Sequence, residues 1–178
     1  MRSAAKQSKE WIVESFFDLL SVKPLHSITI SEIADNAELD RRTFYRHFKT
    51  KEDVISYYIQ EASQHYKKAM QKRGTETDDN CMMTQAFFEV CVKNKDVLMI
   101  LEKQNLLHLL ISDLNSIFAE NQHTFFGQEE LQLENLDYVL AFNTGGFWNL
   151  LIKWLADDGK KTPEQMAEIV GRIFSRDS

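Results

Sequence analysis

Hydrophobic residues recur along this chain at intervals of three and four positions, the spacing that places side chains on one face of an α-helix. Between about residues 5 and 22, Ile12, Phe16 and Leu19 follow this spacing, while charged residues occupy the other faces. Helix breakers are rare, since the 178 residues include six Gly and two Pro. The pattern therefore predicts an all-α protein.

The same periodicity divides the chain into about nine helices separated by short polar segments. The polar run Gly74 to Asn80 is expected to be a loop, and Gln122 to Gln128 is expected to be a break. Thr162 followed by Pro163 is typical of a helix start. We expect helices at about 5–22, from 30, at 41–48, 51–72, 82–94, 95–103, 105–121, 129–156 and from 163.

Residues 29 to 51 contain two short helical patterns that meet at a tight turn. Thr29 stands three residues before Glu32, the spacing at which a hydroxyl and a carboxylate cap each other's backbone amides and stabilise a helix start by about 1 kcal/mol. Asp40 is a good N-cap for the next helix, expected at 41–48. Two short, separately capped helices are therefore predicted here.

The second of these helices has an apolar face and a cationic face. Phe44 and Phe48 are four positions apart and share the inward face, whereas Arg42 and Arg46 point almost opposite to them, with Tyr45 alongside. Arginine binds phosphate and reads guanine edges, and tyrosine hydroxyls bind phosphate. The pattern favours a surface for nucleic acid, and a solvated charged face is the alternative that it leaves open.

The net charge of −6 is distributed unevenly along the chain. Residues 1–73 hold 13 Lys and Arg against 10 Asp and Glu, a balance of +3. Residues 74–178 hold 8 against 17, a balance of −9. A mildly basic head on an acidic body is the asymmetry that orients a protein on DNA by its head, although an accidental gradient is also compatible with these counts.

The run from Ile28 to Asp53 closely resembles the DNA-binding segment of TetR/AcrR-type transcriptional regulators. That family has a threonine opening the second helix, a T-[FL]-Y-x-[HY]-F motif in the third and a lysine opening the fourth. Here these features are Thr29, the run Thr43 to Phe48, and Lys51. The resemblance implies a three-helix helix-turn-helix domain at 1–50, joined by a long helix to a helical effector-binding and dimerisation domain within 51–178.

The resemblance also implies roles for individual residues. DNA phosphates are expected to be held by Thr29, Tyr45, His47 and Lys51, and base edges in the major groove are expected to be faced by Arg41, Arg42, Thr43 and Arg46. The chain departs from the family pattern at Arg42, where a small residue is common, and at Glu38, where the turn usually has Gly. Glu38 is therefore either strained at positive φ, at a cost on the order of 1 kcal/mol, or part of a different turn.

Two apolar seams run along the segment 129–156. In TetR-type regulators the last two helices pair across a two-fold axis, so the resemblance places the dimer interface at Asn143, Phe147, Leu150, Trp154, Ile169 and Ile173. The second seam consists of Tyr138, Phe142, Trp148, Ile152 and Leu155. Gly145 and Gly146 within the same helix indicate close backbone contact or a bend, or else a tolerated weak spot.

Family members usually enclose an effector pocket among the middle helices. The candidate wall residues in this chain are Phe87, Cys91, His108, Phe118, Phe142 and Trp148. Most of them would belong to a hydrophobic core in any case, so the core interpretation stays open for each. His108 is the most informative, because a polar ring in a leucine-rich stripe needs a partner.

The sequence lacks the features of an enzyme, a metal protein or a membrane protein. Paired carboxylates, a nucleophile with a base, a metal cluster and a glycine-rich phosphate loop are all missing at usable spacings, and no cofactor is expected. Cys81 and Cys91 are expected to be free, buried thiols. The segment Met1 to Glu10 does not resemble a signal peptide, and no apolar run approaches the roughly 20 residues that span a bilayer, so we expect a cytoplasmic protein.

These features together predict a homodimeric transcription factor that binds a palindromic operator, most simply a repressor released by a small-molecule effector. The alternative is a DNA-binding co-regulator or activator controlled by a protein partner. An apolar cavity of a few hundred Å³ in the body favours the first function, and a closed, well-packed body favours the second.

Overall fold

The computed structural model describes residues 4–73, 80–120 and 134–174. Within these ranges the chain forms nine α-helices and one short 3-10 turn, and it contains no β-strand. The prediction of an all-α protein is therefore confirmed. No helix in these ranges combines the length and the apolar character needed to cross a bilayer.

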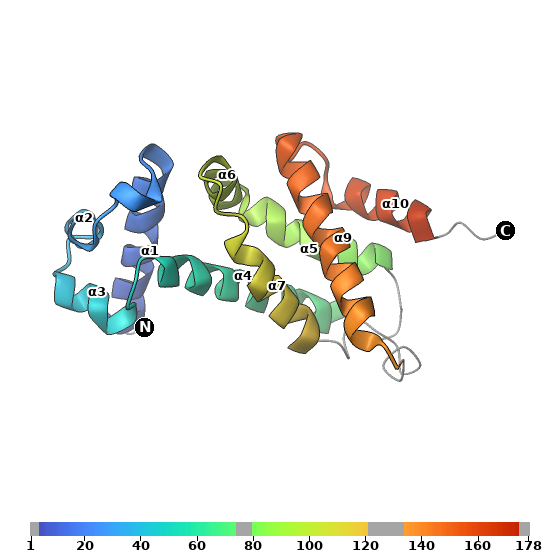
Figure 1. The fold of residues 1–178 in the computed structure, drawn as a ribbon, viewed down its shortest axis with the longest axis horizontal. Helices are drawn as coiled ribbons and strands as arrows, with labels where there is room; N and C mark the ends of the chain where they lie inside the picture. Colours follow the sequence, from blue (N-terminus) through green and yellow to red (C-terminus); the bar gives the residue numbers. More distant parts are fainter. Residues whose placement is uncertain (1–3, 74–79, 121–133, 175–178) are drawn as a thin grey trace.

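The N-terminal head lies at the left of Figure 1 and consists of α1 (Ala4–Val22), the 3-10 turn η1 (Leu25–Ser27), α2 (Ile30–Asn36) and α3 (Arg41–His47). All three α-helices contribute fully buried side chains to one core, among them Ile12, Phe16, Leu20, Ile33 and Phe44. Burying such a side chain contributes about 1.5–3 kcal/mol. Packing, rather than helix propensity, therefore holds α2 and α3 in place, because helices this short are unstable alone.

The long helix α4 (Glu52–Arg73) leaves the head and enters the body, where it packs against α5 and α7 (Figure 1). The remaining body helices are α5 (Asn80–Lys93), α6 (Lys95–Lys103), α7 (Leu109–Glu120), α9 (Leu136–Ala156) and α10 (Pro163–Phe174). Aromatic rings join α5 to α9, with ring centroids 5.1 Å apart for Phe87 and Phe147 and 5.7 Å apart for Phe88 and Trp154. These contacts form the centre of the body core.

Helices α5 and α10 lie side by side along much of their length. A Cβ atom added at Gly171 of α10 would collide with Sγ of Cys81 on α5, so glycine at this position permits the close approach of the two helices. Cys91, further along α5, is buried, whereas Cys81 is half-buried, and neither forms a disulfide. Cys81 therefore packs between α5 and α10.

Two helices begin later than the periodicity predicts. Helix α7 begins at Leu109 rather than residue 105, because Asn105 is left-handed (φ 57°) and the Leu106 N–H donates to the Leu101 carbonyl over 2.8 Å. Helix α9 begins at Leu136 rather than residue 129. The predicted break at 122–128 lies outside the described residues, and so does the predicted loop Gly74 to Asn80 except for Asn80, which is the first residue of α5 rather than part of a loop.

The seams of α9 differ from the prediction, since the first seam is buried or half-buried and the second is exposed only at Tyr138, Phe142 and Ile152, with Leu155 2% exposed. Phe147 and Trp154 are 7% and 2% exposed and pack inside their own chain, so their assignment to a dimer interface is wrong. Asn143 and Leu150 are half-buried. The apolar side chains exposed on α9 and α10 are Tyr138, Phe142, Ile152, Ile169 and Ile173. The error arises because periodicity finds apolar stripes on a helix but does not say which stripe faces the core.

The paired glycines of α9 have no close neighbour in the part of the chain that the structure describes. A Cβ added to Gly145 or Gly146 would have no atom of this part within 4 Å, and the helix continues through both residues. Close contact with the described residues of the monomer therefore does not explain these glycines.

Candidate nucleic-acid interface and effector cavity

Both short helices of the head begin at side-chain caps. Thr29 Oγ1 accepts from the Glu32 N–H at 3.2 Å, and Glu32 Oε2 accepts from the Thr29 N–H at 2.8 Å, which completes the predicted capping box. Asp40 Oδ1 accepts from the Thr43 N–H at 2.6 Å at the start of α3. The caps fix where each helix starts, and hence which side chains of α3 face outward.

The turn between α2 and α3 places Glu38 at a positive φ of 54°. The Leu39 N–H donates to the Ala34 carbonyl at 2.9 Å and the Glu38 N–H donates to the Asp35 carbonyl at 3.1 Å, the hydrogen-bond pattern of a Schellman motif. Of the two possibilities raised by the sequence, the structure shows the first: the usual turn is kept, and Glu38 occupies a conformation that favours glycine.

The outward face of α3 presents cationic and hydrogen-bonding groups to solvent. Arg41, Arg42 and Arg46 are exposed, and Tyr45 is 50% exposed. No ion pair in the described part of the chain joins any of these arginines to a carboxylate. Their guanidinium groups are therefore available to phosphate or to base edges.

Thr43 differs from the expectation that it faces base edges. Its side chain is buried, with 7% exposed, and its Oγ1 accepts from Arg46 Nη2 at 3.0 Å. The reason is its position one residue before Phe44, on the edge of the inward face. Thr43 therefore orients the Arg46 side chain in this structure.

His47 is half-buried and hydrogen-bonded to α1. Its Nε2 lies 2.8 Å from Ser8 Oγ, and the Ser8 hydroxyl donates to the Ala5 carbonyl at 3.1 Å. Because the single hydroxyl proton of Ser8 is engaged by Ala5, Nε2–H of His47 is the donor to Ser8. Burial, followed by the charges of Arg46 and Lys9, lowers the pKa of His47 below 6.5. The Nδ1 atom remains for an outside partner.

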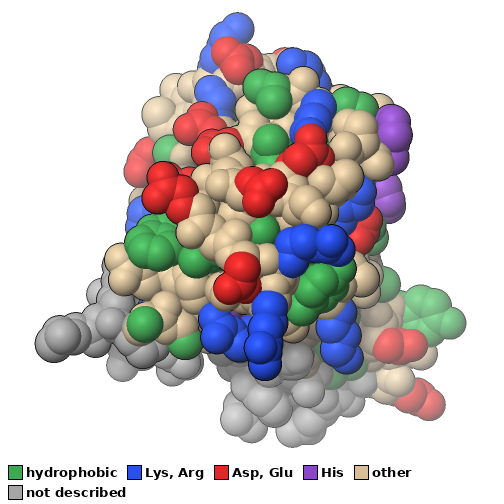
Figure 2. Space-filling view, turned by 90° about the vertical axis from the view of Figure 1, so that its left-hand side faces the viewer, with side chains coloured by type: hydrophobic (Ala, Val, Ile, Leu, Met, Phe, Trp, Pro, Cys, Tyr) green, Lys and Arg blue, Asp and Glu red, His purple; other side chains and the backbone are tan. Residues whose placement is uncertain are grey.

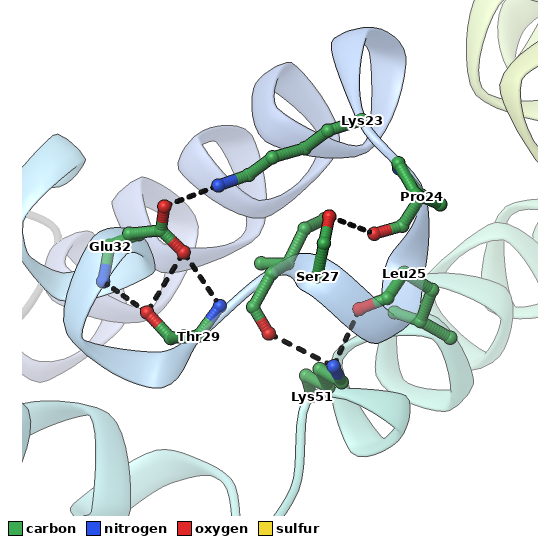
Figure 3. A network of polar contacts seen from close by, with 8 residues as sticks. Lys23, Pro24, Leu25, Ser27, Thr29, Glu32 and Lys51 are labelled. Carbon is green, nitrogen blue, oxygen red and sulfur yellow. Dashed lines mark hydrogen bonds and ion pairs between the residues drawn. The ribbon is translucent and has the colours of Figure 1, made fainter.

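Lys51 also binds within the head. Its Nζ donates to the Leu25 carbonyl at 2.5 Å, a bond drawn in Figure 3, and to the Ile28 carbonyl at 2.9 Å. Leu25 is the first residue of the η1 turn and Ile28 is its C-cap, so Lys51 ties the chain just before α4 to the entrance of the helix-turn-helix segment. An ammonium group has three N–H donors, and two are used here.

Three carboxylates at helix starts, Glu32, Asp40 and Asp53, have lowered pKa values because they accept hydrogen bonds from local partners. The pKa of Glu32 is lowered to about 2, mainly because the carboxylate accepts from Lys23 Nζ and then from the amide and hydroxyl of Thr29 (Figure 3). The Thr43 amide lowers the pKa of Asp40, and the Thr50 amide lowers that of Asp53. These acids therefore stabilise helix starts.

Figure 2 shows the resulting charge distribution on the end of the molecule formed by the head. Lys and Arg side chains gather along its lower part, the level at which α3 lies in Figure 1, and Asp and Glu side chains lie mostly above them. A cationic edge of this kind is suited to a polyanion.

The body contains an apolar cavity of about 80 Å³ between α4, α5, α6, α7 and α9. The residues that line it are Tyr58, Ile59, Ala62, Ser63, Tyr66, Phe87, Val90, Cys91, Asn94, Val97, Leu98, Leu101, Leu110, Leu114 and Leu151. Among the described residues no group of His, Cys, Asp and Glu side chains is arranged to hold a metal ion. The cavity is therefore the candidate effector site.

Only some of the residues predicted to form the effector pocket line the observed cavity. Phe87 and Cys91 line the cavity. His108 is exposed and its Nδ1 lies 2.9 Å from the Asn105 carbonyl, and Phe142 is 75% exposed, so the assignment of both to the wall is wrong. Trp148 is half-buried outside the lining, and the side chain of Phe118 lies outside what the structure describes. His108 was misplaced because α7 begins only after it.

Two family profiles match the chain. Residues 12–58 match the bacterial regulatory proteins of the tetR family, and residues 82–176 match a transcriptional regulator C-terminal region. The chain belongs to the TetR family. This membership confirms the resemblance seen in the helix-turn-helix segment and places the protein among DNA-binding transcriptional regulators, a non-enzymatic family.

Individual TetR-family relatives share only part of the sequence. The HTH-type dhaKLM operon transcriptional activator DhaS of Lactococcus lactis subsp. lactis (strain IL1403) is 33% identical over 49 residues. This match spans 28% of the chain and 26% of that protein. The shared sequence is therefore about a quarter of the relative's length.

Solved structures share the TetR-family fold over nearly the whole chain. The fatty acid degradation regulator FadR from Bacillus halodurans has a TM-score of 0.62 and 16% identity over 93% of each chain. FadR from Bacillus subtilis, solved in complex with stearoyl-CoA, has a TM-score of 0.60 and 17% identity over 94% of this chain and 97% of that chain. The dihydroxyacetone kinase operon activator DhaS has a TM-score of 0.60 and 15% identity over 93% of each chain. At these identities the likeness shows the fold alone.

Three polar residues that connect parts of this TetR-family chain were not predicted from the sequence. Ser8 holds His47, Asn94 bonds to Tyr58, and Gln104 bonds to the end of α1. The sequence could have indicated an inward position for Ser8, because it lies four positions before Ile12 on the inward stripe of α1. No such pattern indicates the contacts of Asn94 and Gln104, whose partners are far away in sequence.

Proposed function

We propose that this protein is a homodimeric transcriptional regulator that binds a palindromic operator, most simply as a repressor released by a small-molecule effector. The observation that carries the proposal is the row of exposed arginines on α3, Arg41, Arg42 and Arg46, on a helix fixed by caps and by buried phenylalanines. An α-helix fits the major groove, and arginine is the commonest side chain to read guanine there.

The contacts of the head support a division of roles within the interface. Arg41 and Arg42 have no partner in the described part of the chain and would read base edges, with Arg46 oriented by Thr43. Tyr45 has an exposed hydroxyl suited to phosphate, whereas Thr29 would bond to phosphate only by giving up the bond from its hydroxyl to Glu32 Oε2, 2.8 Å long. Lys51 keeps one N–H donor and would hold the DNA backbone while fixing the head internally. His47 would donate to phosphate from Nδ1 in its protonated form, because in the neutral ring Nε2–H is directed to Ser8 and Nδ1 is an acceptor.

The proposed dimer uses the apolar surface that the monomer leaves exposed on α9 and α10. Phe142 is 75% exposed, Tyr138 72% and Ile173 60%, and large exposed apolar patches mark interaction sites. Gly145 lies on the same side of α9 as Phe142, three residues on, and would let a second helix approach closely. A two-fold dimer places two α3 helices about one DNA turn apart, roughly 34 Å.

This dimer is tested with a charge placed on the exposed face. Phe142→Asp should convert the dimer to a monomer in analytical ultracentrifugation while the helical circular dichroism is kept. Val92→Asp is the matched control, because Val92 is an exposed apolar residue on α5 (45% exposed). Equal effects of the two variants would argue against the α9 and α10 face as the interface.

The operator is tested by selecting bound fragments from random DNA. A two-fold symmetric consensus is expected, and enrichment of an asymmetric site or of none would contradict the proposed mode of binding. The direction of regulation is tested with a reporter gene driven by the selected site. Expression should rise when the regulator is removed, whereas a fall would make it an activator, as the relative DhaS is described.

The second candidate is control by a protein partner rather than by a small ligand. It is favoured by the modest size of the cavity, about 80 Å³, well below the roughly 300–1,000 Å³ of typical ligand pockets. Operator release by cell extract that persists after small molecules are removed by dialysis would support this candidate, and release by the dialysable fraction would oppose it.

A further inference from the structure

The size of the body cavity limits what could occupy it. Each water molecule in a cavity needs roughly 10–15 Å³ of free volume. The cavity of about 80 Å³ therefore accommodates a molecule of roughly five to eight non-hydrogen atoms. Long acyl chains, such as that of the stearoyl-CoA bound to FadR from Bacillus subtilis, exceed this space. The cavity therefore suits a small molecule.

The lining also limits the charge of an occupant. None of the described residues that line the cavity is an acid, a lysine, an arginine or a histidine. Burial raises the pKa of the Cys91 thiol, which is therefore uncharged at neutral pH. A charged ligand would lose its hydration without gaining a counterion, which is strongly unfavourable. The lining selects for neutral molecules.

Four polar side chains, those of Tyr58, Ser63, Tyr66 and Asn94, lie in the otherwise apolar wall, and Tyr58 and Asn94 are bonded to each other. Tyr58 OH on α4 donates to Asn94 Oδ1 at 2.7 Å, and Asn94 Nδ2 donates to the Val90 carbonyl at 2.7 Å. Both Tyr58 and Asn94 line the cavity. After these bonds the amide keeps one N–H donor and the phenol oxygen keeps an acceptor site, so the pair is able to bond a further polar group.

The position of Asn94 gives a second reason to regard this pair as functional. Asn94 occupies the N-cap position of α6, where asparagine normally accepts a backbone N–H of the first turn and stabilises the helix. Here its side chain makes no capping bond and bonds instead to Tyr58, between α4 and the start of α6. Local rules are broken mostly at functional sites.

Tyr58 also contacts the head. Its ring packs edge-on against Phe17 of α1, with centroids 4.9 Å apart, and its hydroxyl reaches Asn94 in the body. A ligand that bonds to the hydroxyl would therefore act on a side chain that already joins the cavity to the DNA-binding head.

We infer that the cavity binds a small, uncharged, mostly apolar molecule carrying a single hydroxyl or carbonyl group, and that Tyr58 and Asn94 form its polar contact. This inference rests on the proposed function in one respect, that the cavity is the effector site. It adds the chemical class of the effector and the two residues that recognise its polar group.

The test compares three probes of nearly equal size, phenol, toluene and N-methylpyridinium, titrated into the full-length protein and followed by NMR or calorimetry. Phenol should bind several-fold to about tenfold more tightly than toluene, as expected for one added hydrogen bond. N-methylpyridinium should not bind in the cavity. Ala62→Leu, which adds bulk to the cavity wall, should abolish binding of both phenol and toluene.

The role of the polar pair is tested with matched tyrosine variants. Tyr58→Phe keeps the ring against Phe17 but removes the hydroxyl, and Asn94→Leu removes the amide, so the preference for phenol over toluene should fall to about one when both substitutions are present. Tyr57→Phe is the control, because Tyr57 lies outside the cavity lining, beneath Lys9, whose Nζ is 3.6 Å from the ring centroid. This variant should keep the preference.

Several outcomes would overturn the inference. They are equal binding of N-methylpyridinium, saturation by stearoyl-CoA without binding of phenol, binding that survives Ala62→Leu, or an unchanged phenol preference when Tyr58→Phe and Asn94→Leu are combined. None of these titrations uses DNA, whereas operator selection uses no ligand. Failure of the cavity inference is therefore distinguishable from failure of operator binding.

Discussion

Gln104, the C-cap residue of α6, donates its side-chain N–H to the Leu20 carbonyl at 2.8 Å and to the Lys23 carbonyl at 3.3 Å. These carbonyls lie at the C-terminal end of α1, where helix carbonyls lack partners within the helix. The same α6 contributes Val97, Leu98 and Leu101 to the cavity wall. One short helix therefore contacts both the candidate effector site and the head.

Replacing this glutamine tests the connection between head and body. Gln104→Glu should lower the free energy of unfolding by about 1–2 kcal/mol, because a carboxylate donates no hydrogen bond and repels the two carbonyl oxygens. Urea unfolding measures the change. Gln64→Glu, at an exposed position on α4, should have little effect and serves as the control. Equal stability of the two variants would mean that the hydrogen bonds from Gln104 to the end of α1 do not stabilise the fold.

Arg42 should contribute to sequence preference more than to general affinity. Arg42→Ala should lower the affinity for the selected operator by about 1–3 kcal/mol and relax the preference at particular base pairs. Binding to operator variants, measured at one salt concentration, gives the preference. Uniform weakening on all sequences would instead make Arg42 a phosphate contact.

Lys51 should have a structural role and a DNA-binding role. Lys51→Met keeps the aliphatic chain but removes the ammonium that bonds to the Leu25 and Ile28 carbonyls, so the head should lose about 1.5–3 kcal/mol of stability. If the remaining N–H holds a phosphate, the slope of log K against log salt should decrease by about 0.9. Lys49→Met, on the exposed surface, controls for the loss of charge. Reduced stability with an unchanged slope would leave Lys51 a structural role only.

Glu38 offers a stabilising substitution. A left-handed conformation at φ 54° costs a non-glycine residue roughly 1–2 kcal/mol. Glycine avoids this cost, but it loses about 0.5–1 kcal/mol more conformational entropy on folding because it is more flexible in the unfolded chain. Glu38→Gly should therefore raise the free energy of unfolding by up to about 1 kcal/mol, measured in urea. Glu38→Ala retains the strain and should gain nothing. A loss of stability in Glu38→Gly would mean that the Glu38 side chain makes a contribution of its own.

His47 should make stability depend on pH in a narrow range. Its folded pKa is lowered below 6.5 by burial, so the unfolded chain binds the proton more readily. The free energy of unfolding should therefore decrease as the pH falls from 6.5 toward the folded pKa, and this contribution should be fully present above pH 6.5. Urea titrations across this range should lose the step in His47→Asn, whereas His26→Asn, at an exposed site, should keep it.

The sequence by itself determined the local features of the head. Thr29 with Glu32 and Asp40 with Thr43 act through hydrogen bonds between residues three positions apart, so spacing alone predicted both caps. The inward positions of Phe44 and Phe48 follow from helical periodicity in the same way. Short-range rules therefore placed the arginines of α3 on the outside.

Tertiary structure decided every feature that depends on a distant partner. Periodicity revealed two apolar seams on α9, but only packing against α5 shows that Phe147 and Trp154 face inward and Phe142 faces outward. The two bonds of Lys51, the bond of Ser8 to His47 and that of Asn94 to Tyr58 join residues between 23 and 39 positions apart. A helix pattern is fixed by neighbours in sequence, whereas a cavity or a clamp exists only once several helices have packed together.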